Sequence, residues 1–307
     1  MSAVTRRRLL AMAAAAGAAA AQSAPKKTPT LCVFSKHLAF LDYPTLARTL
    51  VDLKVPGCDL TVRPGGHVEP ENVVRDLPRA HAALHGQGVT VPMITTGLLS
   101  ADDPAARPTL EAAHALGVPL FKLGYYRYRD LSKLDETLAS VKRQVDGLAA
   151  LAKDVGIQAG FHNHSGNYVG AAMWDHWSLV KDVDPNAMGF YFDPYHATIE
   201  GGLGGWQIGF NRLAPRILMV AIKDFYWEKT GGKWGVHDCP LGEGMVDFPQ
   251  FFKMLAQTGF SGPITLHQEF EVQGPSKTIR EERTLVAIEK DVDYLRGQLN
   301  AAFGQVA

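Results

Sequence analysis

The chain has 307 residues, 46% of them apolar, and its 31 acidic residues balance its 31 basic ones. A formal net charge of zero gives no support for binding to nucleic acid or to another polyanion. The sequence has too few cysteines for a disulfide framework and none in a zinc motif, so we expect buried thiols at Cys32, Cys58 and Cys239.

Residues 1–24 are typical of an export signal. Three arginines at positions 6–8 precede an apolar, alanine-rich run that reaches Ala21. A charged start, an apolar stretch and small residues predict a secretory signal, and the arginines resemble those of a twin-arginine signal. We therefore expect a signal peptide over residues 1–24 and a periplasmic or secreted protein without a membrane anchor once the signal is removed. A retained membrane helix is the alternative, although the run is shorter than the ~20 residues of a membrane span.

From residue 25 onward, short apolar or β-branched runs alternate with segments of helical periodicity. Eight runs are predicted strands: residues 30–37, 57–63, 89–96, 119–125, 157–163, 188–193, 217–223 and 263–270. Between two of them, one apolar stripe with helical spacing comprises Leu134, Leu138, Val141, Val145, Leu148 and Ala152. Capped helix starts are predicted by two pairs, Ser132 with Asp135 and Asp247 with Gln250.

Glycines mark the ends of four predicted helices, each directly before a strand: Gly88, Gly117, Gly156 and Gly259. Glycine accepts the left-handed conformation that ends a helix, so these positions indicate repeated strand–helix units and a parallel sheet. Eight units over residues 25–307 predict a single (β/α)₈ TIM barrel of the α/β class. The alternative is an open doubly wound sheet, but residues 35–38 lack the glycine-rich phosphate turn that usually follows its first strand. We expect the glycine cluster at 201–205 to be a flexible loop after the sixth strand.

Ionisable residues gather where the predicted strands end, which is where barrels of this kind place their active sites. In chain order these candidates are His37, Arg63, His162, His164, Asp193, His196, Lys223, His267, Glu269 and Glu271. Residues two apart on a strand share a face, so His162 and His164 should lie on one face, as should His267 and Glu269. Imidazole and carboxylate ligands in this mixture predict one bound divalent metal ion, with Mn²⁺, Zn²⁺, Co²⁺, Fe²⁺ or Mg²⁺ as the candidates.

The same residues resemble the xylose isomerase-like barrel superfamily of sugar phosphate isomerases and epimerases, over about residues 30–300. The resemblance is carried by residues 161–164, 192–196, 222–224 and 240–247, together with Glu269. It implies a metal held by a Glu on strand five, an Asp on strand six, a His on strand seven and a Glu on strand eight. Asp193 and Glu269 match this pattern, whereas His162 replaces the first Glu and Ala221 replaces the His. The chain thus resembles a divergent branch, in which the ligand set could be completed by His164, His196 or His237.

The resemblance also implies proton transfer next to a carbonyl, in which a base removes the α-proton and a cation stabilises the enediolate. The expected metal ligands are His162, His164, Asp193, His196 and Glu269. Glu269 and His164 are also the candidate acid or base groups, and Lys223 is the expected partner of the oxyanion. The predicted substrate-binding residues are His37, Arg63, Tyr126, Trp227, His237 and Glu243.

The expected function is isomerisation or epimerisation of a free or glycosidic keto-sugar, assisted by the metal. A lyase reaction by β-elimination, or a hydration, stays open because it needs the same proton abstraction. Two other classes also stay open: a metal-dependent hydrolase of the same fold, including a nuclease, and a catalytically silent carbohydrate-binding barrel. Zero net charge argues against the nuclease, and the two departures from the ligand pattern favour the silent barrel. We expect a small carbohydrate and no nucleic acid as partner, and we leave open a homo-oligomer.

Overall fold

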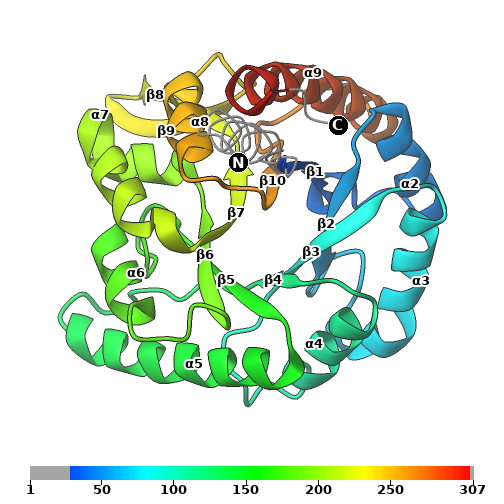
Figure 1. Ribbon diagram of the computed structural model, residues 1–307. Helices are drawn as coiled ribbons and strands as arrows, with labels where there is room; N and C mark the ends of the chain where they lie inside the picture. The colour runs from blue at the N-terminus through cyan, green and yellow to red at the C-terminus, as the bar shows by residue number, and fades with distance from the viewer. Residues whose placement is uncertain (1–27, 305–307) are drawn as a thin grey trace, which may run out of the picture.

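Eight short strands form a closed parallel barrel at the centre of the molecule (Figure 1). The computed structural model describes residues 28–304, and the predicted export signal over residues 1–24 lies outside the described residues. Around the barrel the strands follow the order β1-β10-β7-β6-β5-β4-β3-β2, with every neighbouring pair parallel. Their bounds are β1 (Thr30–Phe34), β2 (Gly57–Val62), β3 (Thr90–Thr96), β4 (Leu120–Lys122), β5 (Gln158–His162), β6 (Met188–Phe192), β7 (Ile217–Ile222) and β10 (Pro263–Leu266). The predicted (β/α)₈ barrel and the positions of its eight strands are therefore confirmed.

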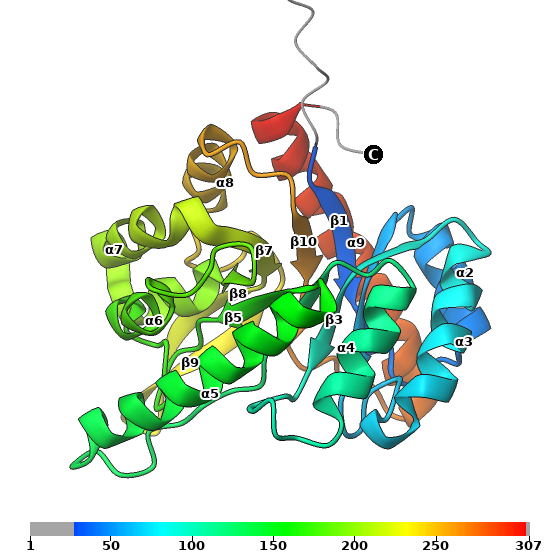
Figure 2. The same cartoon turned by 60° about the horizontal axis from the view of Figure 1, so that its bottom comes forward.

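A ring of helices covers the outer face of the barrel (Figures 1 and 2). The α-helices are α2 (Tyr43–Asp52), α3 (Val73–His85), α4 (Ala106–Ala115), α5 (Leu134–Val155), α6 (Met173–Val180), α7 (Pro194–Leu213), α8 (Phe248–Gln257) and α9 (Lys277–Phe303). Short 3₁₀ helices are η1 (Ser35–Leu38), η2 (Pro70–Asn72) and η3 (Ala214–Arg216). On α5 the predicted stripe faces inward, with buried Val141, Val145, Leu148 and Ala152. The strands are thus covered on both sides, which explains their almost continuously apolar sequences.

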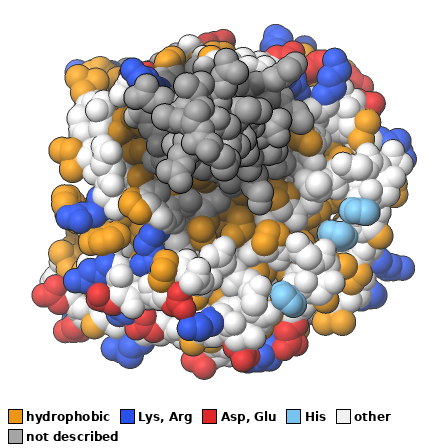
Figure 3. Space-filling model, viewed as in Figure 1, with side chains coloured by type: hydrophobic (Ala, Val, Ile, Leu, Met, Phe, Trp, Pro, Cys, Tyr) orange, Lys and Arg blue, Asp and Glu red, His pale blue; other side chains and the backbone are white. Residues whose placement is uncertain are grey.

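The surface and the thiols agree with the composition of the chain. Acidic and basic side chains are interspersed on the molecular face drawn in Figure 3. Within residues 28–304, no helix combines the length and the apolar character that a membrane span requires. Buried free thiols are found at Cys32, Cys58 and Cys239, as predicted.

The glycine stops lie where the sequence predicts them. Left-handed φ values of 75–86° occur at Gly88, Gly117, Gly156 and Gly259. At Gly156 the N–H donates to the carbonyl of Ala152 and ends α5. The predicted cap of α8 is also confirmed, because Asp247 Oδ1 accepts the N–H of Gln250 at 3.1 Å.

Two local predictions are wrong. Ser132 does not cap α5, because its N–H and hydroxyl donate to Asp130, two residues earlier, in a tight turn. The glycine cluster at 201–205 is not a loop but part of α7, which bends at Gly202 with φ 53° and ψ −145°. The chain passes so close to itself at this bend that a Cβ on Gly201 would lie 2.4 Å from the nitrogen of Trp206.

An antiparallel hairpin follows β7 and contributes to the cavity at the carboxyl ends of the barrel strands. Its strands are β8 (Asp224–Thr230) and β9 (Lys233–Cys239), joined at Gly231 and Gly232. Both glycines have positive φ values, 60° and 83°, as a two-residue type I′ turn requires. A Gly-Gly pair between two strand-like runs is typical of such a hairpin, so the sequence itself carries the signal for this turn.

Candidate active site

A cavity of about 330 Å³ opens at the carboxyl ends of the barrel strands, the end toward which the arrows of β1 and β10 point in Figure 2. Its size falls within the ~300–1,000 Å³ of ordinary small-molecule sites. Six residues predicted from the sequence line it: Arg63, His164, His196, Lys223, His267 and Glu269. The rest of the wall includes Lys36, Asp238 and the rings of Phe34, Tyr125 and Tyr195.

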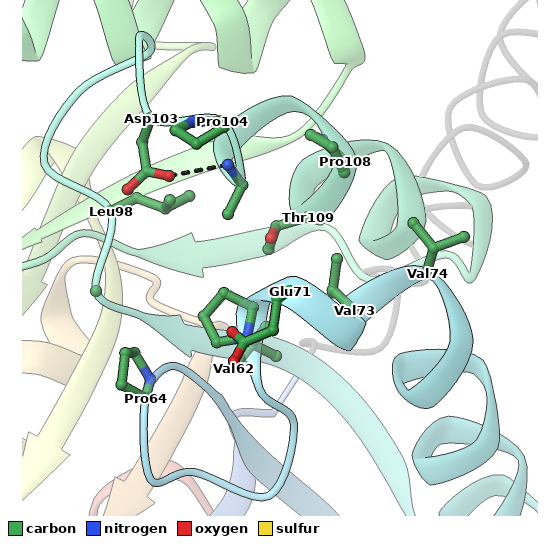
Figure 4. Close-up of a pocket in the computed structure, with 13 residues that line it drawn as sticks. Val62, Pro64, Glu71, Val73, Val74, Leu98, Asp103, Pro104, Pro108 and Thr109 are labelled. Atoms are coloured by element: carbon green, nitrogen blue, oxygen red, sulfur yellow. Dashed lines mark hydrogen bonds between the residues drawn. The ribbon is translucent and has the colours of Figure 1, made fainter.

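A larger cavity, of about 590 Å³, lies between the first turns of α3 and α4 (Figure 4). Its wall consists mainly of proline and aliphatic side chains, such as Pro64 and Pro108. The ionisable residues in this wall are Glu71 and Asp103, and Asp103 accepts the backbone N–H of Ala105 at 2.8 Å. Because the described residues of this wall include no lysine, arginine or histidine, we place the candidate active site in the smaller cavity.

Lys223 lies at the centre of a buried group, called the Lys223 cluster, that also contains Asp193, His162 and His196. Its ammonium is 3.2 Å from Asp193 Oδ2 and 2.8 Å from His196 Nε2. His162 Nε2 lies 3.2 Å from the same Asp193 oxygen. The four side chains are between 0% and 8% exposed, so the ammonium and the carboxylate form a buried ion pair.

The hydrogen bonds of the Lys223 cluster fix the positions of its protons. The ammonium can only donate, so His196 accepts at Nε2 and donates from Nδ1 to the hydroxyl of Ser165, 2.8 Å away. The carboxylate can only accept, so His162 donates from Nε2, and its Nδ1 accepts the hydroxyl proton of Tyr125 at 2.9 Å. Both imidazoles are neutral in this scheme. Burial supports it by lowering the pKa of each imidazole well below its usual value.

Helix α7 and strand β5 hold Asp193 in place. Asp193 is the N-cap of α7, and its Oδ1 accepts the backbone N–H groups of Tyr195 at 2.9 Å and His196 at 3.3 Å. Asn163, directly after β5, donates to the carbonyl of Asp193 and accepts its N–H. Burial raises the pKa of Asp193, and the positive charge of Lys223 opposes this shift. Lys223 therefore stabilises the ionised form of the Asp193 carboxylate. Asn163 was not among the predicted site residues, although it stands between the two predicted histidines of strand five.

A second set, called the Glu269 group, comprises Glu269, His37 and His267 and borders the same cavity. Glu269 Oε2 pairs with the ammonium of Lys36 at 2.8 Å. Its other oxygen, Oε1, lies 3.7 Å from His37 Nε2 and 3.9 Å from His267 Nδ1. Burial lowers the pKa of His37 to about 4 and that of His267 well below its usual value, so both are neutral near pH 7. Burial alone would raise the pKa of Glu269, but His37, Lys223 and Lys36 outweigh it, and the net shift is downward.

A buried hydrogen-bond chain beneath the cavity orients His267. Its Nε2 lies 3.0 Å from the hydroxyl of Tyr191, which donates to Asp59 at 3.3 Å. Asp59 also accepts the hydroxyl of Thr95 at 2.7 Å, and burial raises the pKa of Asp59 to about 7. None of these three supporting residues was predicted, because they lie inside the barrel and not at the strand ends.

His164 lines the cavity but belongs neither to the Lys223 cluster nor to the Glu269 group. Its ring packs against that of His196 at a tilt of 31°, with centroids 3.8 Å apart, and its Nδ1 lies 2.9 Å from the carbonyl oxygen of Ser165. A carbonyl only accepts, so Nδ1 carries the proton and Nε2 keeps its lone pair. Burial lowers the pKa of His164 to about 4, which makes it a neutral proton acceptor at neutral pH.

The predicted metal ligands lie in two places instead of one. The imidazoles and the carboxylate of the Lys223 cluster bring three donor atoms within 4.8 Å of one another, and those of the Glu269 group do the same. The three donors of the Lys223 cluster already surround the ammonium of Lys223. In addition, strand seven carries a buried Ala221 where the resemblance implies a His ligand. One ion shared by Asp193 and Glu269, as the resemblance implies, therefore does not fit these residues.

Some predicted substrate-binding residues lie away from the cavity wall, namely Tyr126, Trp227, His237 and Glu243. Tyr126 is buried, and its hydroxyl donates to the carbonyl of Leu99. Side chains alternate between the two faces of the β8–β9 hairpin, so Val236 and Asp238 line the cavity while His237 between them faces away. Of the other two, Arg63 lines the cavity and His37 lies behind Glu269.

Comparison with known proteins finds one family match and several similar proteins. Residues 66–288 match the family model described as xylose isomerase-like TIM barrel. An inosose dehydratase of Lacticaseibacillus casei is 26% identical over an alignment of 188 residues that covers 53% of this chain and 61% of that protein. The chain thus spans about three fifths of the length of this curated relative.

Solved structures share the fold at low identity. The D-psicose 3-epimerase of Clostridium cellulolyticum H10, determined with D-tagatose, has a TM-score of 0.65 at 15% identity, covering 88% of this chain and 99% of that one. A xylose isomerase-like TIM barrel protein from Mycobacterium smegmatis, in complex with magnesium, has a TM-score of 0.66 at 15% identity, covering 90% and 98%. At such identities the likeness establishes the fold alone.

Proposed function

The chain belongs to the xylose isomerase-like TIM barrel family, and from that premise we propose that it is a carbohydrate enzyme of the isomerase, epimerase or lyase type. The observation that carries the proposal is one cavity wall that presents an ammonium, Lys223, and two proton acceptors, Glu269 and His164. The similar inosose dehydratase and D-psicose 3-epimerase are named for reactions of keto-cyclitols and ketoses. Dehydration and epimerisation beside a ketone share the removal of an α-proton, and we assign this step to the cavity.

Lys223 stabilises the negative charge that develops in this step. An ammonium has three N–H bonds, of which Asp193 and His196 accept two. The third is available to an oxygen of a ligand in the cavity that Lys223 lines. When the α-proton leaves, its bonding electrons move to the carbonyl oxygen, and a preorganised cation lowers the energy of the resulting enediolate.

Glu269 and His164 are the two candidate proton carriers. Glu269 is ionised and its side chain is 26% exposed, so a ligand can reach it. His164 is neutral and holds a lone pair at Nε2. Return of the proton to the opposite face of the same carbon gives an epimer, and return to a neighbouring position gives an isomer. Departure of a β-hydroxyl instead gives a dehydration product.

We propose a free or glycosidic keto-sugar as the substrate. The rings of Phe34, Tyr125 and Tyr195 in the cavity wall offer apolar faces to the C–H faces of a sugar. Export by the proposed signal over residues 1–24 would place the protein in the periplasm or outside the cell, where sugar phosphates are scarce. This location is part of the proposal and is tested by fractionating cells that express the whole chain.

Hydrogen–deuterium exchange at carbon tests the proposed reaction. The purified chain is incubated in D₂O with a panel of keto-sugars and 3-keto-glycosides, and loss of the α-proton is followed by ¹H NMR. We expect exchange with at least one sugar, slowed about 10²–10³-fold by Lys223→Met, the usual effect of losing one oxyanion partner. Glu269→Gln tests the proton acceptor, and His237→Ala, which lies away from the cavity, is the matched control. Unchanged exchange in both cavity variants would refute the assignment.

A catalytically silent carbohydrate-binding barrel is the second candidate. It is favoured by the departures from the family's ligand pattern at His162 and Ala221. Isothermal titration of the same sugar panel, combined with the exchange assay, distinguishes the two, because a silent barrel binds a sugar and exchanges no proton.

A further inference from the structure

We propose that the Glu269 group binds one late transition-metal ion of the zinc class through His37 Nε2, His267 Nδ1 and Glu269 Oε1. The site follows from the contacts of these residues and does not depend on the proposed reaction. The two proposals meet at Glu269, because with the ion bound Glu269 is a ligand and His164 is the remaining proton acceptor.

Neighbouring barrel strands bring the three donors together. His37 lies in η1, directly after β1, and His267 and Glu269 follow β10, which pairs with β1. Tetrahedral bonds of ~2.1 Å put ligand atoms about 3.4 Å apart, close to the 3.7 Å and 3.9 Å that separate Glu269 Oε1 from the two nitrogens. Two imidazoles and one carboxylate are the protein ligands of several catalytic zinc and non-haem iron sites. His267 and Glu269 line the cavity, so the remaining coordination positions face a space that ligands can enter.

His37 Nε2 is the atom that points to a ligand. The side chain is 8% exposed, and Nε2 has no hydrogen-bond partner among residues 28–304. Its 3.7 Å distance to Glu269 is too long for a hydrogen bond. Buried polar atoms without a partner are rare and costly in native proteins. An ion between His37 and the carboxylate would satisfy both groups.

His267 presents an unprotonated nitrogen to the same point. Because the Tyr191 hydroxyl donates to Asp59, its oxygen accepts the proton of His267 Nε2. His267 Nδ1 then keeps its lone pair on the side of Glu269. Phe34 stacks on the imidazole with ring centroids 4.3 Å apart and fixes its plane. A hydrogen bond at the distal nitrogen is the usual support of a metal-binding imidazole.

The surrounding charges favour some ions over others. Lys36 forms an ion pair with Glu269 Oε2, so Oε1 is the carboxylate oxygen that can bind the ion. Lys223 and Arg63 add two further positive charges near His37. A single carboxylate among three cations is a poor site for Mg²⁺, which relies on oxygen ligands, whereas imidazole nitrogens favour Zn²⁺ and Co²⁺. We therefore expect Zn²⁺ and Co²⁺ to bind and Mg²⁺ not to compete.

Metal titration of the purified chain tests the site without any substrate. After removal of metals by a chelator, Zn²⁺ binding is measured by calorimetry, and Co²⁺ binding by its visible absorption. We expect one Zn²⁺ per chain, with affinity lowered at least about 100-fold by His37→Ala or Glu269→Gln, since even a lost outer-shell partner costs ~10–100-fold. Tyr191→Phe removes such an outer partner and should weaken binding by about tenfold.

Matched controls separate this site from other histidines. His176 is also a buried imidazole without a hydrogen-bond partner, but it belongs to no group of potential metal ligands within the described residues, so His176→Leu should retain zinc. His164→Ala removes a cavity imidazole outside both donor groups and should also retain zinc. Thermal unfolding checks that each variant folds, and His37→Gln replaces His37→Ala if the latter does not.

Three results would overturn the proposal: no stoichiometric zinc, full affinity in a folded His37 variant, or displacement of zinc by equimolar Mg²⁺. Loss of zinc in His162→Gln with retention in His37→Ala would move the ion to the Lys223 cluster and also overturn it. Because the deuterium-exchange assay uses a different readout, a failure of the metal site and a failure of the proposed reaction are distinguishable.

Discussion

The Lys223 cluster and the Glu269 group have the same composition at the same cavity: two imidazoles, one carboxylate and a neighbouring lysine. They differ in where the lysine lies. Lys223 is 8% exposed and donates to a carboxylate and an imidazole, whereas Lys36 is 42% exposed and pairs with the outer oxygen of Glu269. The first set therefore contains its cation, and in the second His37 Nε2 has no hydrogen-bond partner among the described residues. Donor type and proximity do not define a metal site until every proton and lone pair is assigned.

The two sets are also neighbours along the rim. Strand β10 lies between β1 and β7, so the residues after these three strands adjoin one another. A ligand in the cavity can contact the ammonium of Lys223 on one side and the Glu269 group on the other. The proposed reaction needs both sides, a fixed positive charge for the oxyanion and a group that handles the proton.

Lys223→Met should have the largest effect on stability. The variant leaves the Asp193 carboxylate, which is 0% exposed, without its ammonium. Removal of one partner from a buried ion pair costs ~3–5 kcal/mol. Urea unfolding measures the loss, and we expect the lower end of this range because Asp193 keeps its bonds to the first turn of α7.

A second substitution is the control for this prediction. Adding Asp193→Asn to Lys223→Met removes the unpaired charge and keeps a good helix cap, so the double variant should recover at least half of the loss. If the single variant is as stable as the natural chain, the ammonium does not complete the cluster, and the contrast between the two sets fails.

His176→Leu should have the next largest effect, and it appears as a change in pH dependence. The His176 ring packs against Phe161 and Phe190 with centroids 4.1 Å and 5.1 Å away, and burial lowers its pKa to about 3. The unfolded chain binds this proton near pH 6.5, so the stability linked to His176 is fully present above that pH and falls as the pH drops toward 3. Between pH 7 and pH 4 the natural chain should lose ~3 kcal/mol more than the variant.

Denaturant unfolding at the two pH values measures this difference. The comparison with His37 is informative because, among residues 28–304, both imidazoles have a nitrogen without a hydrogen-bond partner and only His37 belongs to a group of potential metal ligands. Parallel pH profiles of variant and natural chain would contradict the assignment of a depressed pKa to His176.

Tyr125→Phe should have a smaller effect within the Lys223 cluster. It removes the hydroxyl that donates to His162 Nδ1 and leaves a buried nitrogen without a partner, at a cost of ~1–3 kcal/mol. The phenyl ring retains the contact with Lys122, whose Nζ lies 3.3 Å from the ring centroid. Urea unfolding measures the loss, and ¹⁵N NMR of His162 reports whether its proton remains on Nε2. An unchanged stability would show that Tyr125 does not determine this tautomer.

The fold could be predicted from the sequence because its signals are local. Each barrel strand is an apolar run covered on both sides, and glycines such as Gly156 end helices by their own backbone conformation. The predicted cap of α5 is wrong because Ser132 forms hydrogen bonds with Asp130, two residues earlier, instead of with the start of the helix. The β8–β9 hairpin is absent from the predicted elements, and its alternating side chains determine the orientation of His237.

The candidate site could be predicted only as far as its rim. The rule that barrel sites lie at strand ends brings Lys223 and Glu269 to one cavity. Sequence spacing cannot show that the Lys223 ammonium reaches between the donors, because this depends on side-chain length and direction across three strands. Nor can it show that Lys36 meets Glu269, a residue 233 positions away.

Lys36→Met should have the smallest effect on stability and is the sharpest test of the difference between the two lysines. The Lys36–Glu269 pair is 42% and 26% exposed, and such pairs contribute about 0–1 kcal/mol. Zinc affinity should rise by up to about tenfold, because a unit and a double positive charge roughly 6 Å apart in water repel by ~1.4 kcal/mol. Added salt should reduce this gain, since it screens exposed charges. A fall in zinc affinity would mean that Lys36 holds Glu269 in place, and that both lysines serve their carboxylates in the same way.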